Sequence, residues 1–476
     1  MDRDVQDMAL ERQLDFAGKR AHVIGIARSG LAAAEILKSV GANVVMHDQK
    51  NVQQLEDALN KVRKMGLDVR TGDEAYEGIE HADLVIASPG VPVSCPGIVT
   101  AMEHSITIIS EIEFAYRISP APIIAITGTN GKTTTSAMIG DILREQGRQV
   151  LVAGNIVAGE IRLPLSRAAY RASASEIIVA EISSFQLEWI SSFKPRVAAL
   201  LNISADHMDR HSDMDQYSDT KARIFQCQDT TDTAIVNADD PRVMSYVPQI
   251  KSAVWQFSRK TEVEFGTFAR GSEVWARTAA GDQLICDTSS MKLRGAHNVE
   301  NVLAASAAIL SFGAEKDFVQ EIVDKFEPLE HRLEPVIEVD GVEFLNNSMC
   351  TNMLAALRSL EAIGRPAVVI AGGKGKGDDY VQLGEAFNKY AKHVVLIGDD
   401  AALIEEAVNK AGFRRISHAL SMEEAVEVAW RHAKPGDAIV LSPGCASFDM
   451  FKNFEHRGQV FKSAVHALAD RVGNQR

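Results

Sequence analysis

A short loop rich in glycine, threonine and lysine carries the clearest chemical signal in this chain. The loop at 127–133 reads TGTNGKT; it follows the apolar run IIAIT at 123–127 and precedes a helical pattern at 136–146. Where a strand, such a loop and a helix follow one another, glycine amides and the helix N-terminus bind phosphate oxygens. Lys132 would neutralise the β- and γ-phosphates, and the Thr133 hydroxyl would reach a Mg²⁺ ion. The loop is shorter than the common G-x-x-x-x-G-K-[ST] form, but its context predicts a phosphate site.

Side chains that could complete a Mg²⁺ site follow two other apolar runs. A Mg²⁺ ion takes oxygen ligands beyond those of phosphate, usually a carboxylate. Glu181 ends the run EIIVAE, and Asp206 and His207 follow the run RVAALLNIS. A histidine in a loop is more often structural or exposed than functional. At strand ends beside a phosphate loop, however, these residues are candidates for metal and substrate groups.

The first part of the chain alternates strand and helix patterns. Apolar runs at 20–26, 43–48 and 82–88 are separated by segments with helical periodicity, which predicts a parallel sheet. Gly25, Asp48 and Ser88 stand at the carboxyl ends of these strands, where such sheets bind ligands. Ordinary turn chemistry explains the same residues, because a Gly-x-x-x-Ser-Gly turn is a weak fingerprint. Both interpretations remain open.

The rest of the chain repeats this alternation twice more. The sequence SPAP at 119–122 marks a linker, and 251–297 has short alternating stretches typical of added strands. The pattern breaks again around 326–335, and strands are then expected at 342–347, 367–373, 393–398 and 437–443. We therefore predict an α/β protein of three domains, at 1–118, 119–327 and 328–476.

The composition argues against several classes of protein. The net charge of −14 over 476 residues disfavours nonspecific binding to nucleic acid. No apolar run approaches the roughly 20 residues that span a bilayer, and the first residues lack the apolar region of a signal peptide. The five cysteines are scattered and form no CxxC pair, so we expect neither a disulfide framework nor a zinc site. These features are typical of a cytoplasmic enzyme, with a monomer as the default.

Several segments together resemble the Mur ligase family over essentially the whole chain. They occur in the family's order and read TGTNGKTTT, EISSFQLE, NISADHMDRH, KARIF, GAHNVEN, EHR and SPGCASFDMFKNFEHRG. The resemblance implies a Rossmann-like N-terminal domain that binds a UDP-linked substrate, a central ATP-binding domain with the phosphate loop, and a Rossmann-like C-terminal domain that binds an amino acid. The more distant folylpolyglutamate synthases share the phosphate loop but not the N-terminal domain type or the SPGCAS segment.

The resemblance further implies ATP-dependent amide synthesis in the making of peptidoglycan precursors. The substrates would be UDP-N-acetylmuramoyl-L-alanine and an amino acid, with D-glutamate favoured. The substrate carboxylate would take the γ-phosphate to form an acyl phosphate, which the amine of the amino acid then attacks. Concentrated positive charge must stabilise the transferring phosphoryl group, which is a task of positioning and electrostatics.

The family's catalytic and nucleotide residues carry over to positions in this chain. Lys132, His207 and Lys221 would be catalytic, and Lys221 would carry a carbamate, although without the resemblance it reads as a solvated lysine on a helix. Two Mg²⁺ ions would lie near Thr133, Glu181, His207 and Lys221. ATP would contact Gly128, Thr129, Asn130, Gly131, Lys132, Thr133, Thr134, Asn298, Arg332 and Asn347.

The substrate residues carry over in the same way. The UDP-sugar would contact Ser29, Asp48, Ser88 and Asn155. The amino acid would contact Thr351, Lys376, Ser447, Phe448 and Phe454.

One segment departs from the family pattern. The stretch 344–352 reads FLNNSMCTN, where relatives usually carry N-D-S-K-A/G-T-N. Asn347 takes the place of an aspartate that contacts ribose, and Met349 takes the place of a lysine that helps bind the amino acid. A thioether carries no charge and is a weak acceptor. Three readings follow: a D-glutamate ligase with a rearranged carboxylate site, a ligase with another amino acid such as L-glutamate, or a catalytically silent nucleotide-binding relative.

The substitution Met349→Lys tests whether this side chain lines the amino-acid site. An ionic contact to a carboxylate contributes about 1.5–3 kcal/mol, so the variant is expected to bind D-glutamate about ten- to a hundredfold more tightly. The apparent KM for D-glutamate measures this. An unchanged or higher KM would mean that the protein holds the amino acid by a different set of contacts.

Overall fold

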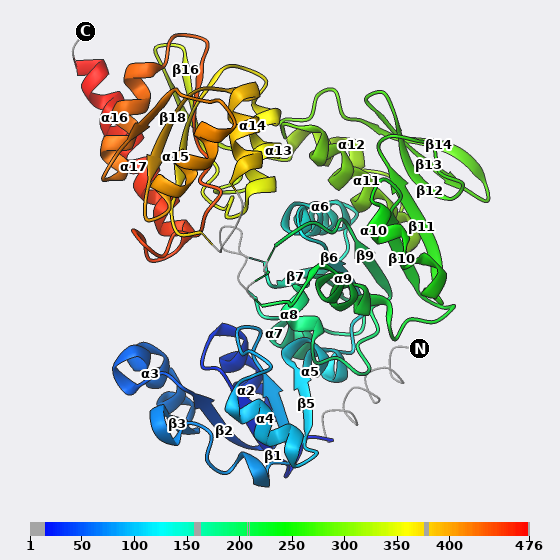
Figure 1. Ribbon diagram of the computed structural model, residues 1–476. Coiled ribbons are helices and arrows are strands. Elements are labelled where there is room, and N and C mark those ends of the chain that lie inside the picture. The colour runs from blue at the N-terminus through cyan, green and yellow to red at the C-terminus, as the bar shows by residue number, and fades with distance from the viewer. Residues whose placement is uncertain (1–14, 157–162, 207, 209, 376–379, 475–476) are drawn as a thin grey trace. The chain divides into compact units, whose positions relative to one another are not determined.

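In the part of the chain that the structure describes, the strands form three separate sheets. The computed structural model describes residues 15–156, 163–206, 208, 210–375 and 380–474, and these contain the α/β elements shown in Figure 1. The predicted α/β class is thereby confirmed. The first and second sheets belong to one compact unit and the third sheet to another. Within the described residues, no helix has both the length and the apolar character needed to cross a membrane.

The first sheet has five parallel strands in the order β3-β2-β1-β4-β5. Ala21 and Val23 pack on one face of the sheet with Ile36 of a covering helix, and Ile24 packs on the other face with Ile98. Both faces are therefore buried, as expected for a doubly wound sheet. The strands are β1 (Arg20–Ile24), β2 (Asn43–Asp48), β3 (Asp68–Thr71), β4 (Leu84–Ala87) and β5 (Thr107–Ser110), and the helices are α2 (Arg28–Ser39), α3 (Glu56–Met65), α4 (Pro96–Glu103) and α5 (Glu111–Ile118).

The second sheet has nine strands in the order β14-β13-β12-β11-β10-β9-β6-β8-β7. Neighbours from β7 to β12 pair parallel, whereas β12, β13 and β14 pair antiparallel. The predicted strands within 251–297 thus extend the central sheet instead of forming a sheet of their own. The strands are β6 (Ile123–Thr127), β7 (Val150–Gly154), β8 (Ile177–Glu181), β9 (Val197–Leu200), β10 (Thr233–Asn237), β11 (Ala253–Ser258), β12 (Gly266–Arg270), β13 (Glu273–Thr278) and β14 (Gly281–Asp287).

Seven helices follow the strands of the second sheet among the described residues. The longest are α6, which begins at the phosphate loop, and the alanine-rich α11, which the sequence predicts from about Asn298. The seven are α6 (Lys132–Glu145), α7 (Leu165–Arg171), α8 (Ser184–Leu187), α9 (Met214–Ala222), α10 (Pro241–Met244), α11 (Ala296–Ser311) and α12 (Val319–Lys325).

The third sheet has six strands in the order β15-β16-β20-β17-β18-β19, and only the pair β15–β16 is antiparallel. Along β17, Val369 faces a core that includes Phe387, while Val368 and Ile370 face a second core that includes Phe461. The strands are β15 (Glu334–Val339), β16 (Val342–Asn346), β17 (Ala367–Gly372), β18 (Ala391–Ile397), β19 (Ile416–His418) and β20 (Ala438–Leu441), and the helices are α13 (Met353–Ile363), α14 (Val381–Tyr390), α15 (Ala401–Lys410), α16 (Met422–His432) and α17 (Phe454–Asn474).

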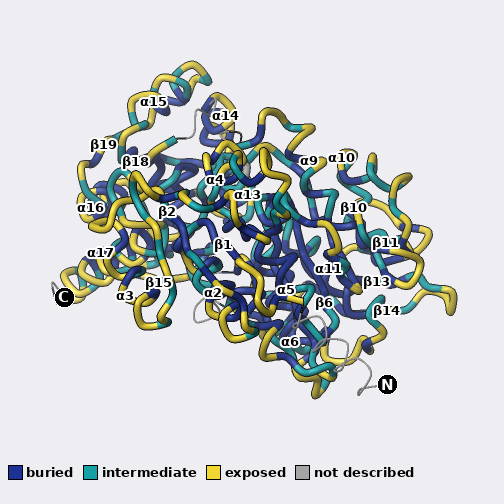
Figure 2. The backbone as a smooth tube through the Cα atoms, turned by 90° about the horizontal axis from the view of Figure 1, so that it is seen from below, coloured by how far each residue is buried: buried dark blue, intermediate teal, exposed yellow. Residues whose placement is uncertain are grey.

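Burial explains why these strands read as continuous apolar runs. Figure 2 shows the strands mostly buried and the exposed residues gathered on loops and outer helix faces. Every residue of β4, β6, β8, β9, β17 and β20 is buried. A strand covered by helices on both faces loses the alternation of polar and apolar residues that a half-exposed strand shows. Polar side chains are thereby confined to strand ends, where the candidate site residues lie.

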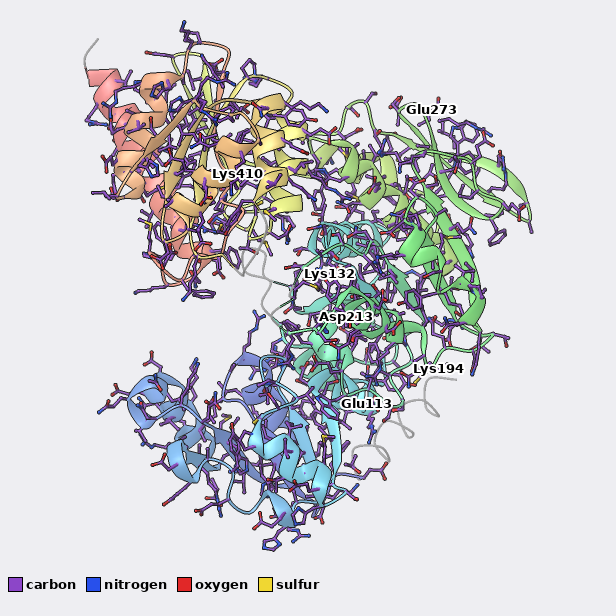
Figure 3. The ribbon with its side chains drawn as sticks, viewed as in Figure 1. Glu113, Lys132, Lys194, Asp213, Glu273 and Lys410 are labelled. Carbon is purple, nitrogen blue, oxygen red and sulfur yellow. The ribbon has the colours of Figure 1, made fainter. Side chains whose placement is uncertain are left out.

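A fully buried carboxylate stabilises the first unit. Glu113 in α5 accepts hydrogen bonds from the backbone amides of Ser191 (3.1 Å), Ser192 (3.0 Å) and Phe193 (2.8 Å). Arg117 Nε donates to it at 2.8 Å, and Figure 3 marks its place. Burial alone would raise the pKa of Glu113, but the hydrogen bonds from Ser192, Ser191 and Arg117 outweigh burial and hold the pKa below its usual value.

Glu113→Gln removes this charge and is expected to lower the free energy of unfolding by about 2–4 kcal/mol. Because the folded-state pKa is depressed, the difference from the native protein is complete above the unfolded-state pKa, about 4.3. It shrinks as the pH falls through the folded-state pKa. Urea unfolding between pH 3 and 7 measures this, with the exposed Glu145→Gln as control. A difference that stayed constant down to the lowest pH would contradict the assignment.

Candidate active site

The phosphate loop joins β6 to α6 and is held by two residues distant in sequence. Gly131 has a φ of 86°, and a Cβ there would lie 2.3 Å from Asn301 Oδ1. A side chain at this position would therefore be strained. Asn202 Oδ1 accepts a hydrogen bond from the Asn130 amide (2.8 Å), and Asn202 Nδ2 donates to the Asn130 carbonyl (3.1 Å). Sequence reasoning gave Asn202 and Asn301 no role, although both fall within the quoted family segments.

Two lysine ammonium groups converge on one carbonyl oxygen of the loop. Lys132 Nζ donates to Gly128 O (2.9 Å) and Thr129 O (2.8 Å), and Lys221 Nζ donates to the same Gly128 O at 2.9 Å. Figure 3 labels Lys132 at the start of α6. Lys221 is 2% exposed and lies 4.6 Å from the ring centroid of Tyr217. The reading of Lys221 as a solvated helix lysine is therefore wrong, because α9 turns this side chain into the interior.

The predicted metal ligands Thr133 and Glu181 are in direct contact. Thr133 Oγ1 donates to Glu181 Oε2 at 2.8 Å, and both side chains are buried. They meet because β6 and β8 are neighbouring parallel strands with their carboxyl ends at one edge. A hydroxyl and a carboxylate are hard oxygen donors, so this pair fits a Mg²⁺ ion. Asn155, predicted to contact the substrate, donates to Glu181 Oε1 at 3.4 Å. His207, the third predicted ligand, lies outside the described residues.

The predicted substrate residues of the first sheet gather at one edge. Ser29 lies in the first turn of α2, Asp48 ends β2 and Ser88 follows β4, and these two strands lie on either side of β1. Asp48 Oδ2 accepts from the Ile26 amide (3.0 Å), and Ser88 Oγ donates to Gly25 O (3.1 Å). The side chains therefore shape the turns and also stand where doubly wound sheets bind ligands.

The predicted amino-acid residues of the third sheet differ widely in exposure. Ser447 is buried, Thr351 and Phe454 are half-buried, and Phe448 is 72% exposed. Lys376 lies outside the described residues. Exposure of the Phe448 ring leaves apolar surface available to a ligand.

A buried arginine without an assigned role supports the same loops. Arg457 in α17 donates to Ser348 O (2.8 Å), Ser348 Oγ (3.1 Å) and Cys445 O (3.0 Å). Burial lowers its pKa to about 10. Arg457 stands in the segment SPGCASFDMFKNFEHRG, and its type could have marked it as an anchor, but nothing in the sequence indicates which carbonyls it meets.

The predicted nucleotide residues Asn298 and Arg332 lie around one histidine. Asn298 Nδ2 donates to Arg294 O (2.7 Å) and lies 3.2 Å from His297 Nε2. The pKa of His297 is lowered to about 4, first by burial and then by the charges of Arg358 and Arg332. This neutral imidazole between cationic groups marks a region of positive potential suited to phosphate oxygens.

Family models and curated relatives match almost the whole chain. The model of the Mur ligase MurD-like N-terminal domain matches residues 19–110, that of the Mur ligase middle domain matches 126–309, and that of the Mur ligase glutamate ligase domain matches 331–445. The UDP-N-acetylmuramoylalanine--D-glutamate ligase of Thermoanaerobacter sp. (strain X514) is 40% identical over 457 residues, covering 96% of this chain and 100% of the relative. The protein of the same name from Pelotomaculum thermopropionicum is 42% identical over 454 residues, covering 95% and 99%.

Solved structures agree on the fold. UDP-N-acetylmuramate-alanine ligase MurC from Thermotoga maritima superposes with a TM-score of 0.61 at 17% identity, covering 94% of this chain and 100% of that one. MurF from Acinetobacter baumannii also gives a TM-score of 0.61, at 18% identity, covering 94% and 93%. From the identities to its relatives over almost their entire length, this chain belongs to the Mur ligase family.

Proposed function

We propose that this protein is an ATP-dependent amide ligase that joins D-glutamate to UDP-N-acetylmuramoyl-L-alanine in peptidoglycan precursor synthesis. The observation that carries the proposal is the convergence of Lys132, Lys221 and the Thr133–Glu181 pair on the phosphate loop. A site of this kind stabilises a phosphoryl group in transfer. The relatives at about 40% identity, named as D-glutamate ligases, support this choice of amino acid.

The reaction proceeds in two steps. The carboxylate of the alanyl substrate attacks the γ-phosphate of ATP, which gives an acyl phosphate and ADP. The amine of glutamate then attacks the acyl carbon, and the tetrahedral intermediate expels inorganic phosphate as the amide forms. Lys132 would neutralise the charge of the transferring phosphate, because its side chain starts at the helix N-terminus beside the loop.

Bound Mg²⁺ supplies charge neutralisation at the phosphate oxygens. We propose that Thr133 and Glu181 hold it, with His207 and a carbamate on Lys221 completing two sites. Two ammonium groups on one carbonyl oxygen repel each other. A carbamate would reverse the charge of Lys221, turn this repulsion into attraction, and still leave an N–H to donate to Gly128 O. The shared carbonyl oxygen is the observation that supports this proposal.

We propose three domains at 1–118, 119–327 and 328–476, each with its own ligand. The first would bind the UDP-sugar through Ser29, Asp48 and Ser88. The family models, which match 19–110, 126–309 and 331–445, support these boundaries. The amino acid would bind to the third domain and ATP to the phosphate loop, while Asn298 and Arg332 stay predicted nucleotide contacts. We also propose a cytoplasmic location, which the five free cysteines support, and a monomer as the default assembly.

A second candidate is a ligase with another amino acid. Met349, half-buried where relatives usually carry lysine, favours it, because the side chain offers no charge to a carboxylate. A phosphate-release screen decides between them. The protein is mixed with ATP, Mg²⁺, UDP-N-acetylmuramoyl-L-alanine and a panel of D- and L-amino acids. Release with D-glutamate supports the first candidate, release with another amino acid supports the second, and no release with any would refute both.

Lys132→Ala tests the phosphate site. Removal of the ammonium is expected to abolish measurable amide formation, a loss of at least about a hundredfold in kcat. The coupled release of phosphate measures turnover, and the exposed Lys251→Ala serves as a control that stays active. Turnover retained in Lys132→Ala would mean that the phosphate site is misassigned.

Lys221→Arg tests the carbamate. Arginine keeps the positive charge and most of the length, but forms no carbamate, so amide formation is expected to fall by at least about a hundredfold. Circular dichroism checks that the fold persists, and Lys251→Arg is the matched control. If Lys221→Arg kept native turnover, the positive charge alone would explain the role of Lys221.

A further inference from the structure

The turn that carries Arg332 has an unusual backbone. The residues on both sides of it, His331 and Leu333, adopt positive φ values of 65° and 48°. Both are buried, at 3% and 9% exposure, while Arg332 between them is half-buried. Residues other than glycine occupy this region only when surrounding contacts impose it. The turn therefore depends on contacts from outside its own segment.

The stretch FLNNSMCTN supplies the first set of these contacts. Asn347 Oδ1 accepts a hydrogen bond from the Leu333 amide at 3.2 Å, and the Met349 amide donates to His331 O at 3.2 Å. The Asn347 side chain is itself fixed, because Nδ2 donates to Ser359 Oγ (2.8 Å) and Ser442 Oγ (3.4 Å). Both amide protons are thus directed at protein acceptors, and the side chain is 5% exposed.

A second set of hydrogen bonds holds His331 in place. Asn346 Nδ2 donates to His331 Nδ1 and to Glu334 Oε2, both at 2.9 Å, and the His331 amide donates to Glu334 Oε2 at 3.0 Å. Helix α17 packs closely against the ring at Gly458. A Cβ on Gly458 would lie 2.3 Å from His331 Nδ1, so only glycine leaves room for the imidazole.

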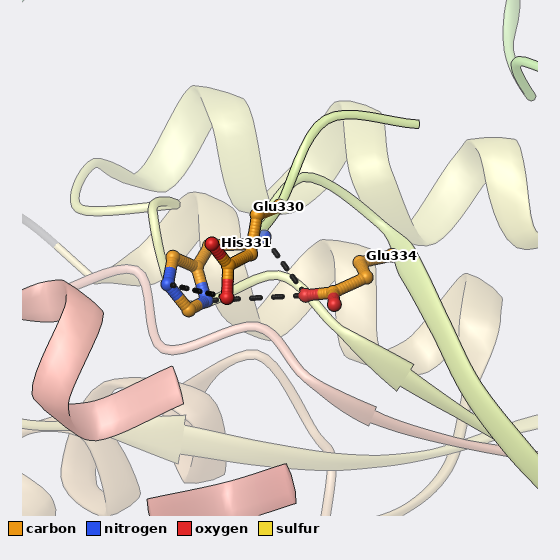
Figure 4. Close-up of side chains that lie close together, drawn as sticks. All are labelled: Glu330, His331 and Glu334. Carbon is orange, nitrogen blue, oxygen red and sulfur yellow. Dashed lines mark hydrogen bonds and ion pairs between the residues drawn. The ribbon is translucent and has the colours of Figure 1, made fainter. Parts of the chain in front are cut away.

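The neighbouring carboxylates resemble a metal site in their spacing, but they bind the turn and a lysine. Glu330, His331 and Glu334 bring three potential ligand atoms together, as Figure 4 shows. Lys462 Nζ already bridges this group, donating to Glu330 Oε1 (2.8 Å) and Glu334 Oε1 (2.9 Å). An ammonium thus provides the positive charge that a metal ion would bring. It also fixes Glu334, which holds both His331 and Asn346.

We propose that Asn347 is a positioning residue, which holds Arg332 toward the nucleotide through the Leu333 amide instead of binding the ribose itself. The inference rests on the proposed function, because Arg332 is taken as an ATP ligand. It refines the expectation that an asparagine in place of aspartate keeps the ribose contact. Its Oδ1 binds the Leu333 amide and its Nδ2 binds two serines, so its effect on ATP passes through the backbone that carries Arg332.

A double-mutant cycle tests whether Asn347 acts on ATP through Arg332. The affinity for ATP with Mg²⁺ is measured by calorimetry for the native chain, Asn347→Ala, Arg332→Ala and the double variant. Asn347→Ala is expected to weaken binding about tenfold, the scale of one lost hydrogen bond to a buried group. In the Arg332→Ala background the same change is expected to cost less than about twofold, because the group it positions is gone.

The same titrations with 2′,3′-dideoxy-ATP separate positioning from direct contact. A positioning role predicts that Asn347→Ala weakens binding of both nucleotides by the same factor. A penalty that disappears with the dideoxy nucleotide, or that persists in full without Arg332, overturns the inference. So does an Arg332→Ala variant with native ATP affinity. Failure of the ligase function is distinct, since it would show as no amide product from the native chain with any amino acid.

A second variant tests the same inference in case Asn347→Ala fails to fold. Gly458→Ala drives a Cβ into His331 and is expected to weaken ATP binding about tenfold, with little effect when Arg332 is alanine. Gly473→Ala is the matched control on the same helix, because a Cβ there meets nothing within 4 Å. Equal ATP affinities in the two glycine variants would contradict the proposed pathway.

Discussion

The convergence of two ammonium groups on the carbonyl of Gly128 is the interaction on which the site depends. Lys132 reaches this oxygen from the first turn of α6, and Lys221 reaches it from α9. Like charges at this separation, shielded from water, are stable only beside compensating negative charge. Glu181, which accepts a hydrogen bond from Thr133 Oγ1, adds a carboxylate beside the same loop. A phosphate chain bound at the loop would bring further negative charge to the two ammonium groups.

The parallel sheets bring the charged and polar groups of the site to one edge of each sheet. Parallel strands end at one edge, and several candidate ligand groups stand at or just beyond such an end: Thr133 beyond β6, Glu181 at the end of β8, and Asp48 and Ser88 in the first sheet. Helices cover both faces of these sheets, so the strand ends offer polar groups more room than the strand interiors do. Fold and chemistry are therefore linked by one constraint, the burial of both faces.

The sequence predicts what local pattern determines and misses what distant contacts decide. Continuous apolar runs such as AVVIAG at β17 were predictable because burial on both faces leaves no other composition, whereas the edge strand β7 gave a weaker signal and was not predicted. Lys221 reads as a surface lysine because nothing local reveals that α9 turns it inward. The Arg332 turn was also beyond prediction, since Leu333 takes its φ from a residue 14 positions later.

The strand order of the third sheet sets when the enzyme can become complete during its synthesis. Strand β20 lies between β16 and β17, although it is the last of the three to be made. Arg457, still nearer the C-terminus, then ties the loop at Ser348 to that at Cys445. On the ribosome, β16 can pair with β15 and β17 with β18 as they emerge, but the place between β16 and β17 is filled only once residues 438–441 have been made. The third sheet therefore closes late in synthesis, through a strand that is distant in sequence from both of its neighbours.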